Sequence, residues 1–595
     1  LAITVMVPNS LGPAELILKH GTQVQKDRYL NDLALGRHVP CFGLTEPNAG
    51  SDATSITSNG VIFKDEDGNL KIKLNFEKRY ITLANIATLI GLAFQLKDPQ
   101  QLLGGQKDLG ITFGLIDASL KGVDNSQRHD PLGIPFVNSP LKGKDVVINI
   151  EDVIGGIDGI GHGWQMLVES LSIGRGISLP SVSLGGSKLA LNVVASYSQI
   201  REQFGLSINH FEGVEEKIAK IGAFTYMLNA SRNYTLDAID NGRKPGVINS
   251  IMKYHATEKF REVINDAMDI LGGAAIIRGE KNLLAHAYFA IPISITVEGA
   301  NILTRNLMQF GQGLIKSHPY IYTQIEALKN KDVNTFDEAF FSHIGLVVTA
   351  FAKSLTYYFT RAYFVSVKGE FKRYKQKLVW TSASFTLLSN IALGLLGPAL
   401  KKRENISARF GDILSYCYLV TSTIREFEKN PKEDDRPMVD YICNYCFNQI
   451  QIAREDILLN LPMLKVFVPF VKLNPIGLKA KDSLNRKIVN NLSKIDYLEG
   501  LTSSIFISKD KKDRLNIFAQ AIKQNEKTKK SFLKIKEAVK AKSIQKDGLL
   551  NMIEEAFEKG LISKNEKSEL KKAYKLKQEV VSVDAFKVKK YKSLR

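Results

Sequence analysis

The hydrophobic pattern and the glycine content of the chain change twice along its length, and these changes limit the folds that it can adopt. Residues 1–39 place apolar side chains at helical spacing, 40–155 combine frequent glycines with short β-rich runs, and the chain from 156 onward returns to long helical patterns. A chain of 595 residues is too long for one compact core. The patterns predict an α+β, mainly α protein with an antiparallel β-barrel or sandwich between helical parts.

The helical part divides further by composition. We expect 1–39 to be the end of an incomplete N-terminal helical domain, 156–319 a helical bundle, 320–500 a second helical region and 501–595 a Lys-rich helical tail. The tail holds 25 basic and 12 acidic residues, which is 13 of the formal net charge of +19. It lacks interleaved aromatic residues, so we predict no nucleic-acid partner and favour a solvated tail over one that contacts anionic lipid. The chain begins at Leu1 without a signal peptide, and we expect that its natural N-terminus is missing.

Three apolar stretches could contact or span a membrane, and each is weighed here against a buried segment of the fold. Residues 378–400 carry no charge but many polar residues, which favours a buried helix, and 80–96 predict a pair of buried strands. Residues 458–471 contain two prolines and are interpreted as a core segment, with an interfacial anchor as the alternative. Four cysteines suit a reducing compartment, and Cys443 and Cys446 have no second ligand pair nearby, so we predict no metal site.

Two segments contain groups suited to a charged cofactor. Residues 41–52 offer hydroxyls and backbone N–H groups to an anion, although a turn-rich strand end has the same composition. Residues 197–205, considered with 269–273, place an arginine beside an aromatic side chain. Such a pair can clamp a phosphate and stack on a ring.

A third segment, 291–305, contains a single carboxylate, Glu298, after an apolar run and before Gly299. A carboxylate beside apolar walls has a raised proton affinity, which suits a general base acting on a carbon acid. A surface glutamate at the start of a helix is the alternative interpretation, and it is common.

Taken together in this order, the segments resemble the acyl-CoA dehydrogenase family, over roughly residues 1–320. Longer matches at residues 6–13, 78–84, 211–216 and 296–305 resemble one branch, the large bacterial acyl-CoA dehydrogenases of fatty-acid degradation (the FadE type). Members of that branch carry a C-terminal helical extension similar to 320–595 here. Five ordered motifs make a chance match improbable. The motifs are Thr45-Glu46-Pro47 with Ala49-Gly50-Ser51-Asp52, Lys78-Arg79-Tyr80-Ile81-Thr82, Arg201-Glu202-Gln203-Phe204-Gly205, Gly272-Gly273 and Glu298-Gly299.

The resemblance implies FAD-dependent α,β-desaturation of medium- or long-chain fatty acyl-CoA in β-oxidation. Glu298, followed by Gly299, would be the base that removes the α proton. Ser51 and Arg175 are the candidate substrate contacts. The candidate contacts to FAD are Leu44, Thr45, Ser51, Tyr80, Thr82, Arg201, Gln203, Phe204, Gly272 and Gly273, and the segment from Arg201 to Gly205 would reach FAD across a subunit interface.

The resemblance also implies partners and a location. It implies an electron-transferring flavoprotein, a homo-oligomer (dimer or tetramer), and a bacterial cytoplasmic enzyme for which peripheral contact with the inner membrane stays open. Glu212, Asp269, Ala300 and Ile302 differ from the common family pattern and affect individual FAD contacts, not the base. The alternatives are an acyl-CoA oxidase, a truncated non-catalytic paralogue that binds acyl-CoA, and a membrane-peripheral scaffold built from 320–595.

Overall fold

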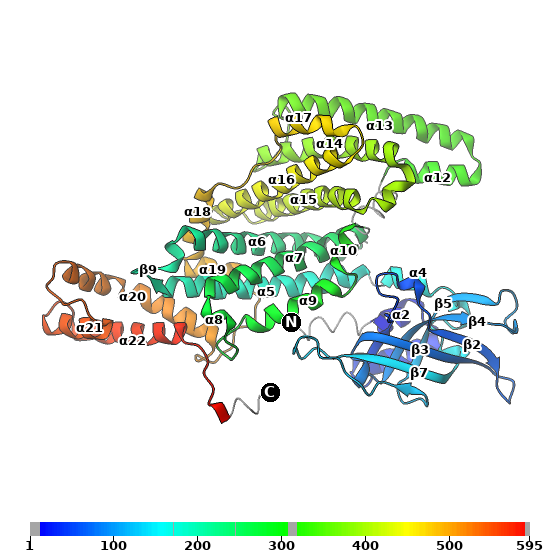
Figure 1. The fold of residues 1–595 in the computed structure, drawn as a ribbon, viewed down its shortest axis with the longest axis horizontal. Helices are drawn as coiled ribbons and strands as arrows, with labels where there is room; N and C mark the ends of the chain where they lie inside the picture. The colour runs from blue at the N-terminus through cyan, green and yellow to red at the C-terminus, as the bar shows by residue number, and fades with distance from the viewer. Residues whose placement is uncertain (1–11, 171, 244, 307–317, 590–595) are drawn as a thin grey trace. The chain divides into compact units, whose positions relative to one another are not determined.

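The computed structural model describes residues 12–170, 172–243, 245–306 and 318–589 (Figure 1). The chain separates into two compact units. The first contains the β domain and the ends of several helices, and the second contains most of the helical part. Their ranges are Leu1–Val182, Thr235–Thr257 and Phe289–Gln309 for the first unit, and Ser183–Tyr234, Glu258–Tyr288 and Phe310–Arg595 for the second.

The described part of 1–39 forms two helices, α2 (Gly12–His20) and α3 (Gln23–Ala34), as the sequence predicts. Thr22 caps α3 through a reciprocal pair of hydrogen bonds with Gln25. The Gln25 amide also donates to the carbonyl oxygens of Glu151 and Val153 at 2.7 and 2.6 Å. One buried glutamine therefore holds the N-terminal helices to the end of the β domain.

The predicted β domain is a curled seven-stranded sheet in the order β1-β4-β2-β3-β7-β6, with β5 paired to β4. Its pairs are antiparallel except β1–β4 and β2–β4, which are parallel. Buried and exposed residues alternate along much of β3, whereas β4 is buried on both faces. The structure therefore confirms one of the two buried strands expected within 80–96, because the rest of that stretch is the end of β3 and a 3₁₀ turn. The strands are β1 (Pro40–Gly43), β2 (Asn59–Lys64), β3 (Leu70–Thr82), β4 (Leu89–Lys97), β5 (Asp108–Asp117), β6 (Val123–Asp124) and β7 (Asn138–Asn149).

The predicted helical bundle is present from Gly163 onward. A two-strand hairpin, β8 (Glu202–Gln203) with β9 (Leu206–Ser207), separates its first two long helices. The short helix expected over 298–316 is described only at its start, since 307–317 lie outside the described residues. The helices are α4 (Gly163–Ser170), α5 (Ser172–Ile200), α6 (Glu212–Asp240), α7 (Gly246–Leu271), α8 (Gly273–Ile276), α9 (Ala285–Thr296) and α10 (Asn301–Leu303).

The second helical region also forms as predicted. Two of its helices, α13 and α14, are long and apolar enough to cross a membrane by length and composition. Only 11% of the apolar window of α13 and 33% of that of α14 is buried. The helices are α12 (Ile321–Asn330), α13 (Val333–Thr360), α14 (Lys372–Leu396), α15 (Glu404–Lys429), α16 (Arg436–Asn460), α17 (Val468–Leu473), α18 (Asp482–Leu492) and α19 (Ile495–Leu501).

The interpretation of 458–471 as a core segment is wrong in its second half. Leu458, Leu461 and Val471 are buried, but Met463 and Phe467, like other apolar residues of this segment, are exposed. The two prolines divide the segment into the end of α16, a short 3₁₀ turn and α17.

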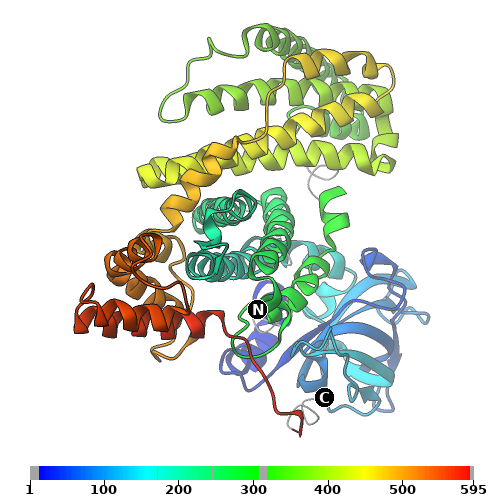
Figure 2. The same cartoon turned by 60° about the vertical axis from the view of Figure 1, so that its left-hand side comes forward.

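The Lys-rich tail is folded rather than merely solvated. It contains α20 (Arg514–Lys540), α21 (Leu549–Glu558) and α22 (Lys564–Val581), drawn in orange and red in Figure 2. These helices share an apolar core, and many of their lysines pair with nearby glutamates. The tail is also tied to the bundle, because Lys577 pairs with Glu202 at 2.7 Å.

Candidate active site

Glu298 lies on a strained turn that follows α9. Its φ is 57°, in the left-handed region, and the φ of Gly299 is 92°. Glycine adopts such an angle freely, whereas a side chain with a Cβ does so at a cost of about 1–2 kcal/mol. The turn therefore holds the carboxylate in a conformation that the surrounding contacts must maintain.

Two cations hold this turn through its carbonyl oxygens. Arg175 Nε donates to the carbonyl of Glu298 at 2.8 Å. Lys253 Nζ, which is fully buried on α7, donates to the carbonyls of Ile295 and Gly299 at 2.9 and 2.8 Å. The carbonyl oxygens of the two successive residues Glu298 and Gly299 thus each accept from a cation.

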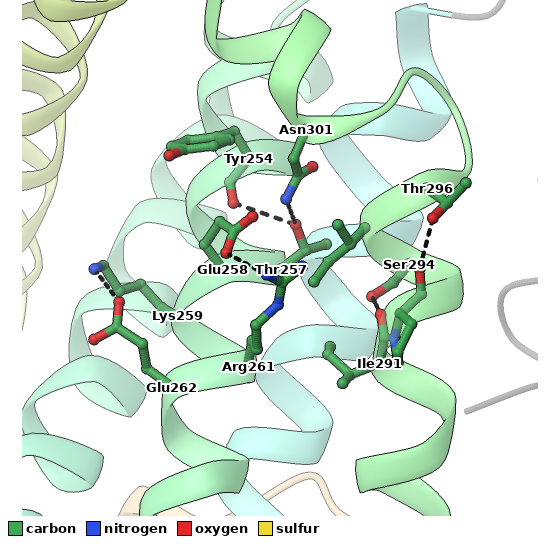
Figure 3. A network of polar contacts seen from close by, with 12 residues as sticks. Tyr254, Thr257, Glu258, Lys259, Arg261, Glu262, Ile291, Ser294, Thr296 and Asn301 are labelled. Carbon is green, nitrogen blue, oxygen red and sulfur yellow. Dashed lines mark hydrogen bonds and ion pairs between the residues drawn. The ribbon is translucent and has the colours of Figure 1, made fainter. Parts of the chain in front are cut away.

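A second layer of polar contacts extends this support, and Figure 3 shows the hydrogen bond between Asn301 and Thr257 that belongs to it. Lys253 Nζ also donates to the Asn301 side-chain oxygen at 2.6 Å, and the Asn301 amide donates to the Thr257 hydroxyl at 2.9 Å. The Thr304 hydroxyl adds a 3.2 Å hydrogen bond to the Gly299 carbonyl. Helix α7 therefore holds the Glu298 turn through one lysine, one threonine and their shared asparagine.

The carboxylate of Glu298 is itself buried, and neither of its oxygens has a hydrogen-bond partner among the residues that the structure describes. Burial raises the pKa of Glu298 to about 7, although the charges of Arg175 and Lys253 act in the opposite direction. The residue before it, Val297, packs on an apolar cluster formed by the β domain, α5 and α9. The cluster contains Ile134, Phe136, Leu179, Val182 and Ala290, with Ile293 and Val297 against it.

The predicted flavin strand is the end of β3. A bulge there gives Tyr80 a φ of 61° and leaves its side chain 61% exposed, while Thr82 is buried. The carbonyl of Thr45 accepts from the backbone N–H of Arg79 at 2.9 Å, so the segment after β1 runs beside this bulge. Leu44 is half-buried there, and Ser51 is exposed on the turn that follows.

A buried ion pair fixes the segment after β1 to β3. Lys78 Nζ lies 2.7 Å from a Glu46 carboxylate oxygen and 3.2 Å from the carbonyl of Leu44. Burial lowers the pKa of Lys78 to about 8, and hydrogen bonds from Lys78, Ser58 and Thr57 hold the pKa of Glu46 at about 2 against the effect of burial. Both groups are therefore charged at neutral pH, and the pair sets the position of Leu44 and Thr45.

The remaining candidate flavin contacts belong to the second unit. Gln203 and Phe204 lie on the β8–β9 hairpin, directly after Arg201, and the Phe204 side chain is 96% exposed. Phe204 and Gly205 both have positive φ, as a two-residue hairpin turn requires. Gly272 and Gly273 are exposed at the start of α8.

The structure thus brings together one of the two candidate substrate contacts and the candidate base. Arg175 touches the Glu298 turn, whereas Ser51 is on a different surface loop of the same unit and has no described contact with the turn. The sequence did not point to Lys253 or Asn301. Glu46 and Lys78 lie in two of the motifs given above, but no functional role was predicted for them. The alternating pattern of β3 could have indicated that Lys78 is buried, because it shares the inward face of the strand with Ile72, Leu74 and Phe76.

Comparisons with known proteins agree with this arrangement. Residues 41–146 match the acyl-CoA dehydrogenase middle domain, 161–311 match the acyl-CoA dehydrogenase C-terminal domain, and 315–586 match the C-terminal domain of bacterial-type acyl-CoA dehydrogenases. The chain belongs to the acyl-CoA dehydrogenase family. The second helical region and most of the Lys-rich tail therefore fall within the last of these three domains, which matches residues 315–586.

Individual relatives show how far the likeness extends. The chain is 30% identical over 311 residues to a 3-(aryl)acrylate reductase of Clostridium sporogenes, a match that covers 51% of this chain and 77% of that protein. It is 52% identical over 98 residues to Protein HemX of Proteus mirabilis, covering 16% and 58% of the two chains. Curated relatives are matched over about half to three quarters of their own length.

The family fold extends into the helical extension. An acyl-CoA dehydrogenase of Bacillus anthracis, solved as a complex with FAD, superposes with a TM-score of 0.67 at 21% identity. The alignment covers 84% of this chain and 82% of the other. The α+β, mainly helical fold predicted from the sequence is therefore confirmed.

Proposed function

We propose that this chain is an FAD-dependent acyl-CoA dehydrogenase that converts medium- or long-chain fatty acyl-CoA into trans-2-enoyl-CoA. The observation that carries the proposal is the buried Glu298 carboxylate, whose pKa is raised to about 7 and whose oxygens have no partner among the described residues. A buried base with this pKa is half deprotonated near neutral pH and keeps its proton-accepting oxygens free for a substrate.

The residues around Glu298 support removal of a proton from carbon. The apolar cluster beside Val297 provides a wall along which an acyl chain can lie, and it excludes water from the carboxylate. Arg175 and Lys253 fix the backbone on both sides of the base, so that the carboxylate keeps one orientation. In this proposal the backbone N–H of Glu298 donates to the thioester oxygen and stabilises the enolate charge that develops there.

The chain's residues also fit the flavin that its family implies. Thr45 and Thr82 would bond the flavin ring, the exposed ring of Tyr80 would lie beside it, and Ser51 would contact FAD or the pantetheine arm. Arg201, Gln203 and Phe204, on an exposed hairpin, would reach the FAD of a second subunit, with Gly272 and Gly273 near its adenine end. When bound, FAD accepts the hydride from the β carbon of the substrate.

The exposed Phe204 supports a homo-oligomer, since a fully exposed aromatic side chain at a hairpin tip is typical of a contact surface. We propose an electron-transferring flavoprotein as the acceptor of the electrons, and a cytoplasmic location with peripheral membrane contact.

Product analysis tests this proposal and separates it from the alternatives. The protein loaded with FAD is incubated with butyryl-, octanoyl- or palmitoyl-CoA and an artificial electron acceptor, and the thioester is analysed by mass spectrometry. We expect loss of two hydrogen atoms from the octanoyl and palmitoyl substrates. Rapid peroxide formation in air without the acceptor would instead identify an oxidase, and tight acyl-CoA binding without product would identify a non-catalytic paralogue.

A further inference from the structure

An exposed apolar stripe runs along α13. Its side chains recur at helical spacing on one face, at positions that extend over roughly 30 Å of the helix. The opposite face packs on α14, where His343 Nε2 lies 2.6 Å from the Asn390 side-chain oxygen. The stripe consists of Phe340, Phe341, Ile344, Val348, Phe351, Leu355 and Phe359, all exposed.

The stripe continues onto the segment that contains α17. The Tyr358 hydroxyl donates to the carbonyl of Phe470 at 3.0 Å, and Arg361 Nε donates to Asn474 at 2.6 Å, so the end of α13 lies against α17 (Figure 1). The exposed apolar side chains of this segment are Met463, Val466, Phe467, Phe470 and Leu473. We call these five and the seven of α13 the apolar face. Twelve contiguous large apolar side chains exceed what a soluble surface usually exposes.

In the two ranges of sequence that contain the apolar face, every Asp, Glu, Lys or Arg residue is basic. Residues 339–369 and 461–481 contain seven basic residues and no acidic one, and all seven are exposed. The first acidic residues outside these two ranges are Glu338, Glu370, Asp456 and Asp482. The basic residues are Lys353, Arg361, Lys368, Lys465, Lys472, Lys479 and Lys481, of which Lys472 also lies 3.9 Å from Glu455.

We propose that the apolar face docks on the surface of an anionic lipid bilayer. Aromatic and aliphatic side chains would enter the boundary between headgroups and acyl chains, while the basic residues would contact lipid phosphates. The helix lies in the membrane plane rather than across it, because one side of α13 is packed on α14.

A second copy of this chain explains the face less well. A two-fold contact would set the face against itself and bring two sets of seven basic residues together. The Lys-rich tail is also a weaker candidate for lipid contact, because many of its lysines pair with glutamates, as Lys527 does with Glu569 at 3.0 Å. This inference rests on the peripheral membrane contact proposed above and names the surface that makes it, and it is tested independently of the desaturation.

Vesicle flotation with the full-length, FAD-loaded protein tests the docking surface. We compare vesicles of phosphatidylcholine with vesicles that also contain phosphatidylglycerol. The variants are Phe341→Ser with Phe351→Ser, and Lys465→Glu with Lys479→Glu. The matched controls, Phe506→Ser and Lys546→Glu, change exposed residues of the tail.

We expect the wild type and both controls to float with the anionic vesicles. The double phenylalanine variant should require on the order of tenfold more lipid of either kind. The double lysine variant should lose the preference for anionic lipid, and its affinity should approach that for phosphatidylcholine alone. Circular dichroism and flavin absorbance, unchanged in all variants, show that the fold is intact.

Two outcomes would overturn the proposal. If the wild type does not float, and the double phenylalanine variant instead halves the oligomer size in light scattering, the face is an interface between copies. If the tail controls abolish flotation as strongly as the phenylalanine variant does, the tail is the lipid contact and the apolar face is not.

Discussion

Lys253 Nζ donates a 2.8 Å hydrogen bond to the carbonyl of Gly299, the residue directly after Glu298. A buried ammonium on α7 thereby fixes a backbone turn whose side chain is the proposed base. The same charge lowers the proton affinity of Glu298 against the larger, opposite effect of burial. Position and pKa of the base are thus coupled through one lysine.

The first prediction concerns that lysine. Lys253→Met removes the cationic donor to the turn and the charge that lowers the pKa of Glu298. We expect flavin reduction by acyl-CoA to slow by roughly tenfold to a hundredfold, and the pH at which its rate rises to move upward. Stopped-flow flavin reduction between pH 5 and 9 measures both.

Lys259→Met is the matched control, because Lys259 is also buried on α7 but donates to Glu262 and Tyr445 instead, each at 2.6 Å. It should lower the melting temperature without moving the pH dependence. If the pH dependence is unchanged in Lys253→Met, Lys253 supports the turn structurally and does not set the pKa of Glu298.

The second prediction concerns stability and pH. The pKa of Glu298 is raised to about 7 in the folded chain from its ordinary value of 4.5, so the folded state holds a proton that the unfolded state has lost between these values. Stability should therefore fall as the pH rises from about 4.5 to 7. Glu298→Gln removes this penalty, which we put at up to about 3 kcal/mol at pH 8.

Thermal unfolding at pH 5 and pH 8 checks this sign. The variant should gain stability over the wild type at pH 8 and little at pH 5. Equal effects at both pH values would mean that Glu298 is not a buried carboxylate with a raised pKa.

The third prediction concerns the buried pair in the β domain. Lys78→Met leaves the charged Glu46 buried without its cation, and we expect a loss of about 3–5 kcal/mol in the free energy of unfolding, with release of flavin. The double variant Lys78→Met with Glu46→Gln should recover part of that loss. Chemical denaturation and flavin content measure the two effects, and no recovery in the double variant would argue against a coupled pair.

The fourth prediction concerns the β8–β9 hairpin. Phe204→Ala removes an exposed ring, so the melting temperature of the flavin-free protein should change little. If the hairpin reaches the FAD of a second subunit, FAD should bind on the order of tenfold more weakly. Fluorescence titration with FAD measures this, and unaltered affinity would remove Phe204 from the flavin site.

Particular residues show how far the sequence predicts this molecule. Alternation along β3 predicts its buried face, and that face includes Lys78, so the buried pair with Glu46 was open to prediction. The apolar run before Glu298 correctly predicts a carboxylate with raised proton affinity. These features depend on local periodicity, which a single sequence displays.

Other features depend on contacts between distant segments. The left-handed φ of Glu298 is maintained by Arg175 and Lys253, which lie far from it in the sequence, so local patterns do not reveal it. The exposure of Phe467 also escaped prediction, because an apolar segment between two prolines looks the same whether it is buried or exposed.

The most direct test of the central claim is anaerobic reduction of the flavin by palmitoyl-CoA in the wild type and in Glu298→Gln. The two proteins should bind FAD equally, since Glu298 faces the substrate in this account. We expect the wild-type flavin band to bleach rapidly and the band of the variant to bleach at least about a thousandfold more slowly. Bleaching of the variant at the wild-type rate would contradict the assignment of Glu298 as the base.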